Sequence, residues 1–147
     1  MKSWLPIAIS ISMTCLPCSS QDLAQAAISV DKCRALASSV MARIEAGDDR
    51  GALELTRSHI RVDEKQFNES RDRTLSERRN VATRFGRVIG TKVVREERVS
   101  DFLYRITYVE KREAHLLRWQ FTFYRARSEW QLNSYTWDDN VAALFGQ

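Results

Sequence analysis

Residues 102–123 read FLYRITYVEKREAHLLRWQFTF, and large apolar side chains recur in this segment at every second position. A period of two is typical of β-strands with one buried face, because successive side chains point to opposite sides of a strand. The apolar members are Phe102, Tyr104, Ile106 and Tyr108, then Leu117, Trp119, Phe121 and Phe123. A short polar break at residues 113–115 separates the two groups, so the segment predicts an antiparallel hairpin.

The same alternation extends the sheet in both directions along the chain. Residues 88–99 predict a strand before the hairpin, with Ser100-Asp101 as the turn, and residues 130–137 predict a fourth strand after it. All the connections are short, so the four strands are expected to form one antiparallel sheet. Large side chains at Tyr124, Tyr135 and Trp137 are expected on the second face, partly covered by a terminal helix or a second subunit.

The chain before this sheet has the period of a helix. Three helices are predicted, over residues 30–44, 48–60 and 63–84. Gly47 and Gly86 are expected to end the first and third helices, and Asp48 and Asp49 to cap the second. The third helix has an apolar stripe made of Phe67, Leu75, Val81, Ala82 and Phe85.

A short terminal helix is expected after the sheet, with Asp138 and Asp139 as its caps. The predicted fold class is therefore α+β, with three N-terminal helices packed on a curved four-stranded antiparallel sheet and a short C-terminal helix. The 147-residue length is that of a single domain.

The first residues have the pattern of an export signal. Lys2 precedes an apolar stretch too short to cross a bilayer, and Ala24-Gln25-Ala26 fits a signal peptidase site. Cleavage is expected after Ala26, with Ala27 as the neighbouring alternative, so residues 1–26 are the signal and residues 27–147 the mature domain. The protein is expected to be exported, either periplasmic or secreted. A membrane anchor is the less favoured alternative, and a lipoprotein is disfavoured because neither Cys15 nor Cys18 follows a small residue such as Gly or Ala.

Cys15 and Cys18 would leave with the signal, which makes Cys33 the only thiol of the mature chain. Cys33 shares a helical face with apolar residues, so burial is favoured over a disulfide-linked dimer. The formal charge of +4 comes from interspersed acids and bases, which argues against nucleic-acid binding. The two histidines have no metal-ligand spacing, and no phosphate loop, dinucleotide fingerprint or catalytic motif occurs, so no metal, cofactor or catalytic residue is predicted.

Two arginines, Arg71 and Arg78, fall with Thr74 inside the apolar stripe of the third helix. A buried guanidinium is costly unless it is paired. The first interpretation is that both reach the rim or pair with sheet carboxylates such as Glu96 or Glu97. The alternative is that they bind an anionic ligand.

Aromatic residues of the sheet offer a second candidate site. Tyr104, Tyr108 and Trp119, with Phe121 and Trp130, would line an apolar pocket in which the phenols orient a ligand, or they would simply be core. Asp138 beside Tyr135 would be a candidate base in an enzyme, although a helix cap is the favoured role of Asp138.

Three short segments carry a resemblance: Glu45-Ala46-Gly47-Asp48, Phe85-Gly86 and Trp130-Gln131-Leu132. In this order they resemble the nuclear transport factor 2-like superfamily, and in particular its small exported bacterial members of unknown function. The resemblance implies a curved sheet that wraps against helices to form a cone open at one end. It fixes no function, because that superfamily includes enzymes as well as binding and assembly modules.

The favoured hypothesis is an exported binding or protein-interaction module of unknown small ligand or protein partner. A homodimer through the outer sheet face is an accompanying expectation. The alternative is an enzyme acting on a small hydrophobic or anionic molecule in the cone. A weaker third hypothesis, association with anionic lipid through the arginines, would show a steep loss of binding with added salt.

Overall fold

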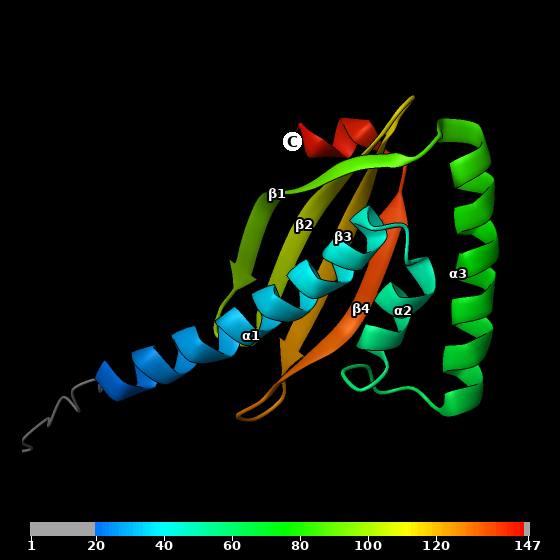
Figure 1. Cartoon of the computed structure of the whole chain (residues 1–147). Helices are drawn as coiled ribbons and strands as arrows, with labels where there is room; N and C mark the ends of the chain where they lie inside the picture. The colour runs from blue at the N-terminus through cyan, green and yellow to red at the C-terminus, as the bar shows by residue number, and fades with distance from the viewer. Residues whose placement is uncertain (1–19, 146–147) are drawn as a thin grey trace, which may run out of the picture.

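The computed structural model describes residues 20–145 of the chain. Three helices come first, α1 (Ser20–Glu45), α2 (Asp49–Thr56) and α3 (Glu64–Phe85). Four strands and a short 3-10 helix follow, namely β1 (Val88–Val99), β2 (Leu103–Arg112), β3 (Leu116–Arg125), β4 (Trp130–Asp138) and η1 (Val141–Leu144). The predicted α+β class is confirmed (Figure 1).

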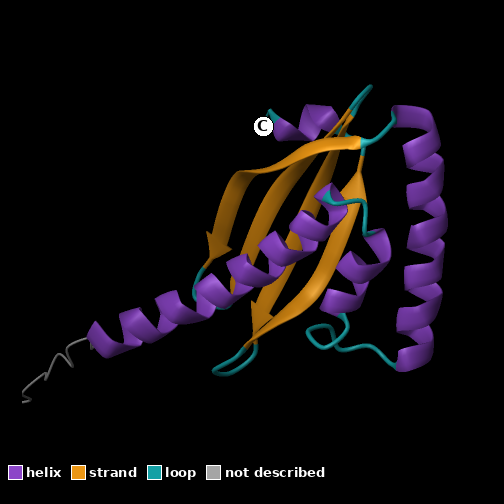
Figure 2. Ribbon diagram, viewed as in Figure 1, coloured by secondary structure: helices purple, strands orange, loops and turns teal. Residues whose placement is uncertain are grey.

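The strands form one antiparallel sheet in the order β1-β2-β3-β4, so that β1 and β4 are its two edges. Each strand pairs with the next one along the chain, as the short connections predict. The sheet is twisted, and α1 crosses one of its faces while α3 stands beside β4 (Figure 2). None of the helices in residues 20–145 combines the length and the apolar character that crossing a bilayer requires.

The helix ends follow the chemistry of their capping residues. The Asp48 carboxylate accepts a hydrogen bond from the Gly51 amide at 2.8 Å and so caps α2. Gly86 ends α3 with φ of 78°, a conformation that glycine adopts without strain. Helix α1 begins at Ser20 rather than at the predicted residue 30. The predicted cleavage site after Ala26 therefore falls within α1, and residues 1–19 of the predicted signal lie outside the described residues.

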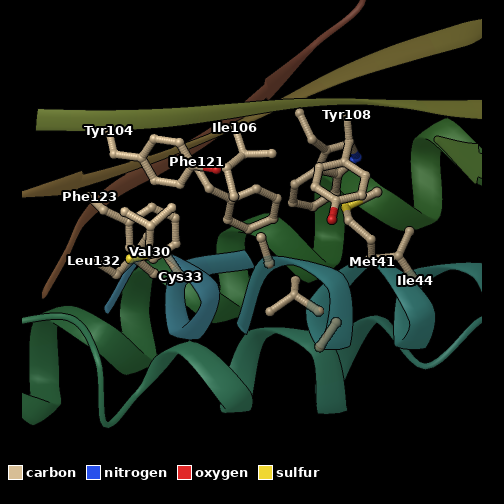
Figure 3. Packing of buried hydrophobic residues seen from close by; sticks show 14 residues of the cluster. Val30, Cys33, Met41, Ile44, Tyr104, Ile106, Tyr108, Phe121, Phe123 and Leu132 are labelled. Carbon is tan, nitrogen blue, oxygen red and sulfur yellow. The ribbon is translucent and has the colours of Figure 1, made fainter. Parts of the chain in front are cut away.

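The core lies between α1 and the sheet. Helix α1 buries one face along residues 30–44, consisting of Val30, Cys33, Ala37, Val40, Met41 and Ile44. These side chains meet the inward side chains of β2, β3 and β4 (Figure 3). Cys33 is 3% exposed, as the sequence predicts, and burial raises the pKa of its thiol to about 12.

A β-bulge at Asn133 changes which face of the sheet the end of β4 presents. Leu132 pairs with Phe123, but the next pair is Ser134 with Thr122, so Asn133 is one extra residue in β4. The prediction that Tyr135 and Trp137 lie on the outer face is therefore wrong. Both pack against the core, and Trp137 stacks on Trp119 with ring centroids 6.1 Å apart.

Helix α3 is attached to the rest of the molecule at few points. Only Phe67, Leu75 and Arg78 of its 22 residues are buried. Ala82 of the predicted apolar stripe is exposed, and Val81 and Phe85 are half-buried. The helix is therefore mostly solvated and is held close to the sheet over a small part of its length.

The C-terminal element is a single 3-10 turn that packs against β3. Its cap is Asn140, whose side chain accepts a hydrogen bond from the Ala143 amide, and not Asp138 or Asp139 as predicted. The Asp138 carboxylate binds Arg118 across the strand pair, with an N–O distance of 2.7 Å, and also accepts a hydrogen bond from the Asn140 amide at 2.9 Å. Asp138 therefore supports the turn just before η1 rather than capping η1 itself.

Candidate functional site: a groove between α3 and the edge of the sheet

An open groove of about 550 Å³, which we call the α3–β4 groove, lies between α3 and the outer edge of β4. Residues 133–137 of β4 line one side. Helix α3 lines the other side with Gln66, Phe67, Ser70, Thr74 and Glu77, and Ile60 and Val62 close the end next to the start of α3. The α3 residues recur mostly at three- and four-residue steps, so one face of that helix looks onto the groove.

The β4 side of the groove is the edge of the strand itself. Successive side chains of a strand point to opposite faces of the sheet. A cavity on one face would therefore meet every second residue, whereas this groove meets five consecutive residues, 133–137. It must follow the margin of β4, where the unpaired side of the backbone lies.

A smaller hollow of about 270 Å³ continues beyond the groove toward the end of α3. The two share Trp137, and the smaller one is also lined by Val81, Arg84 and Asp138. The hollowed surface thus follows α3 and β4 over most of their length.

Arg78 bridges α3 to the sheet at the inner side of this surface. Its guanidinium is 1% exposed and binds Glu110 of β2 at 2.8 Å and Asp49 of α2 at 2.9 Å. The guanidinium also lies beside the stacked rings of Trp119 and Trp137, 5.2 and 5.6 Å from their centroids. Burial acts to lower the pKa of Arg78, but the bonds to Glu110 and Asp49 outweigh it and the pKa is raised.

Glu110 is the centre of this buried cluster, which we call the Glu110 network. Besides Arg78, its carboxylate accepts hydrogen bonds from Arg112 Nε at 2.6 Å and from Trp119 Nε1 at 2.7 Å. Arg112 reaches on to the Gly86 carbonyl oxygen at the end of α3. Two arginines and two carboxylates balance in charge, so the network is a closed structural unit that ties α2 and α3 to the sheet.

The predicted site residues Arg71 and Arg78 therefore have carboxylate partners within the chain. Arg71 binds Glu54 at 2.6 Å and Asp72 at 3.0 Å. Neither arginine is paired with Glu96 or Glu97, the partners named from the sequence. Each hydrogen-bonding nitrogen of Arg78 already faces an oxygen of Asp49 or Glu110, which leaves the anion-site hypothesis without support at this position.

The predicted aromatic site belongs to the core. Tyr104, Tyr108 and Trp119 are all buried and pack in the cluster beneath α1. Tyr104 donates a hydrogen bond to Glu96, whose other partner is Arg34 of α1. Burial raises the pKa of both tyrosines. The aromatic residues that do line the α3–β4 groove are Phe67, Tyr135 and Trp137.

Asp138 and Tyr135 do not converge on one site. The bulge turns Tyr135 inward, where it contacts Thr56, while Asp138 pairs with Arg118. The sequence reasoning also missed Glu110. A usable signal was present, because Glu110 follows Tyr104, Ile106 and Tyr108 at the same two-residue spacing and so had to face inward with them.

No cluster of three or more His, Cys, Asp or Glu side chains is placed to hold a metal ion within residues 20–145. The residues that line the α3–β4 groove carry mostly hydroxyl, amide and aromatic groups. Such groups orient a ligand by hydrogen bonds and apolar contact. No protein-family model matches the chain, and no curated protein or solved structure matches it significantly.

Proposed function

We propose that this chain is an exported binding module with a nuclear transport factor 2-like fold, and that its ligand occupies the α3–β4 groove. The order of three helices and a four-stranded antiparallel meander is consistent with that fold. The observation that carries the proposal is the groove itself, whose volume of about 550 Å³ falls in the range of ligand sites.

The groups in the groove favour binding over catalysis. The phenol of Tyr135 is hydrogen-bonded to the buried Thr56 and burial raises its pKa, so Tyr135 is poorly placed to act as a base in the groove. Glu77 is exposed and is the only charged residue among those that line the groove. An acid–base pair of the kind that hydrolysis or isomerisation needs would require a second ionisable group beside it.

Blocking the groove tests the proposal. Ser70 lines the groove and Ser76, also on α3, does not, although both are exposed. We expect Ser70→Trp to fill the groove and abolish binding, and Ser76→Trp to bind as the unmodified protein does. The measurement is affinity selection from a mixed library of small metabolites and short peptides, read by mass spectrometry, with circular dichroism to verify folding. Equal retention of the same compounds by all three proteins would contradict the proposal.

A homodimer through the outer sheet face accompanies this proposal. Tyr124 is 43% exposed on that face, and η1 covers only part of it. Sedimentation equilibrium of the protein and of Tyr124→Lys would detect the dimer and its loss. A monomer at all concentrations would remove this part of the proposal.

A further inference from the structure

The two edges of the sheet differ in how well they are protected against pairing with another strand. The β1 edge has two bulges, at Ile89 and Val94. The Glu45 carboxylate accepts hydrogen bonds from the amide and hydroxyl of Thr91. The strand also carries charged side chains at Lys92 and at residues 95–98. Bulges, caps and charges are the devices by which proteins keep other strands from pairing with an edge. The β1 edge is therefore protected.

Beyond the bulge at Asn133, the β4 edge has no further bulge, cap or charged side chain along the groove in the described residues. The first part of the β4 edge makes one hydrogen bond to the segment before α3, in which the Leu132 amide donates to the His59 carbonyl oxygen at 3.0 Å. Residues 134–138 then pair with β3 in unbroken register, and residues 133–137 carry no charge. Within residues 20–145, no backbone or side-chain hydrogen bond from outside the sheet is found on the main chain of residues 133–137.

From this edge, we propose that the occupant of the α3–β4 groove is an extended polypeptide segment of a partner protein, which adds a fifth strand to the sheet along β4. The inference rests on the proposed function and names its ligand class. Main-chain hydrogen bonds to the β4 edge would supply affinity, and alternate side chains of the segment would enter the groove beside α3 and supply specificity. Helix α3 then forms the outer wall of the site, and Arg78 ties this helix to Glu110 of the sheet.

The lining of the groove defines the side chains that the segment must carry. Ile60, Val62 and Phe67 make one end apolar, and Glu77 makes the other end acidic. Glu77 is exposed and has no ion-pair partner in the part of the chain that the structure describes. Charge complementarity therefore calls for a lysine or arginine opposite Glu77, and an apolar side chain opposite Phe67.

The spacing of these two ends sets the spacing of the motif. Phe67 and Glu77 are separated by about 15 Å along α3 at 1.5 Å per helical residue. An extended chain rises about 3.3 Å per residue, so this distance corresponds to roughly four or five residues. Side chains on the same face of a strand must be an even number of residues apart, which selects a separation of about four. The expected motif is an apolar residue and a basic residue with three residues between them, in either chain direction.

Selection from a displayed library of random heptapeptides tests the motif on the purified full chain. We expect the unmodified protein to enrich peptides with an apolar and a basic residue at this separation. Glu77→Lys should enrich an acidic residue in place of the basic one, and Ser70→Trp should enrich neither. Glu69→Lys is the matched control, because it makes the same charge change on an exposed residue of α3 that does not line the groove. It should select the same peptides as the unmodified protein.

N-methylation of the best peptide tests strand addition itself. The amides of an extended peptide point alternately to its two sides, so methylating alternate residues blocks one side at a time. One of the two methylated sets should weaken binding by roughly fivefold for each lost hydrogen bond, and the other set should leave the affinity unchanged. Glu77→Gln should weaken the unmethylated peptide roughly two- to fivefold, as the loss of an exposed ion pair does.

The outcomes separate this inference from the proposed function. If no peptide is enriched, or if both methylated sets bind as the parent does, strand addition is wrong. A small metabolite that binds the unmodified protein and not Ser70→Trp would then keep the groove as a binding site with another class of ligand. If neither peptides nor metabolites distinguish Ser70→Trp from Ser76→Trp, both the inference and the proposed function are wrong.

Discussion

At the scale of the residue, one buried glutamate determines how the helices meet the sheet. Glu110 is fully buried and accepts hydrogen bonds from Arg78, Arg112 and Trp119. A buried ion pair gains little over a well-packed apolar replacement, but removal of one partner leaves the other as an uncompensated charge. The stability of the protein should therefore be more sensitive to Glu110 than to any exposed carboxylate.

We expect Glu110→Gln to lower the free energy of unfolding by about 3 to 5 kcal/mol, because two guanidinium groups would remain buried with only Asp49 opposite them. Glu97→Gln, an exposed change of the same chemistry on β1, should alter stability by less than about 0.5 kcal/mol. Urea denaturation followed by circular dichroism measures both values. Equal stability of the two variants would show that the Glu110 network contributes nothing.

A second prediction at the scale of the residue concerns the stability of the folded protein at low pH. Hydrogen bonds from Arg34 and then Tyr104 lower the pKa of Glu96, so this carboxylate stabilises the folded state above the ordinary glutamate pKa. That stabilisation is lost as the pH falls from about 4 through the lowered pKa. Because Glu96 is partly exposed, we expect its contribution to be under about 1 kcal/mol.

The measurement for Glu96 is the free energy of unfolding at pH 7 and at pH 3, for the unmodified protein and for Glu96→Gln. The variant should be less stable at pH 7, and the difference between the two proteins should shrink at pH 3. A difference that stays constant or grows on acidification would contradict the assignment.

At the scale of the element, the helices differ in how firmly they are held. Helix α1 packs a continuous face onto the sheet, whereas α3 buries three of its 22 residues. Elements with few buried contacts open locally at low free energy. Helix α3 should therefore be the first helix to open, without unfolding of the sheet.

Hydrogen exchange followed by mass spectrometry can compare the two helices directly. We expect the amides of residues 68–84 in α3 to exchange at least about tenfold faster than those of residues 33–44 in α1, because local opening precedes global unfolding. A peptide bound along β4 should slow exchange in α3 as well as in β4, since it would contact both. Equal protection of α1 and α3 in the free protein would contradict the weak attachment of α3.

The elements themselves could be predicted because their signals are local. The alternation in residues 102–123 and the capping chemistry of Asp48 and Gly86 lie within a few residues of the structure they determine. The strand bounds of β1 agree with the prediction at both ends. Periodicity therefore sufficed for the order of the helices and strands.

The site could not be predicted in the same way because it depends on pairings between distant segments. The bulge at Asn133 exists only relative to β3, and it reversed the side of the sheet assigned to Tyr135 and Trp137. The partners of Arg78 come from α2 and β2, which no local pattern brings together. The groove depends on both features. The bulge sets which residues of β4 line it, and the Glu110 network sets where α3 lies relative to the β4 edge.

At the scale of the whole molecule, the predicted cleavage site lies close to the described core in the sequence. Val30, the first residue whose burial the structure describes, is buried in the core four positions after Ala26. Removal of residues 1–26 would shorten α1 at its start and leave the described core complete.

We therefore expect a chain of residues 27–147 to unfold at the same temperature as the longer chain, within experimental error. Differential scanning calorimetry measures the unfolding temperature, and N-terminal sequencing of the exported protein identifies its first residue. A first residue other than Ala27 or its neighbour would contradict the predicted site, and a clear loss of thermal stability would show that residues 1–26 contribute to the fold.

The extra residue in β4 also bears on how this sequence should be aligned with others. Asn133 adds one residue to β4, so every position from Ser134 onward faces the opposite side from the one that regular alternation after Leu132 would give. A homologue without that residue, aligned without a gap, would look dissimilar from residue 134 to the end of β4, because its apolar positions would be compared with polar ones. A gap of one residue at position 133 should restore the correspondence.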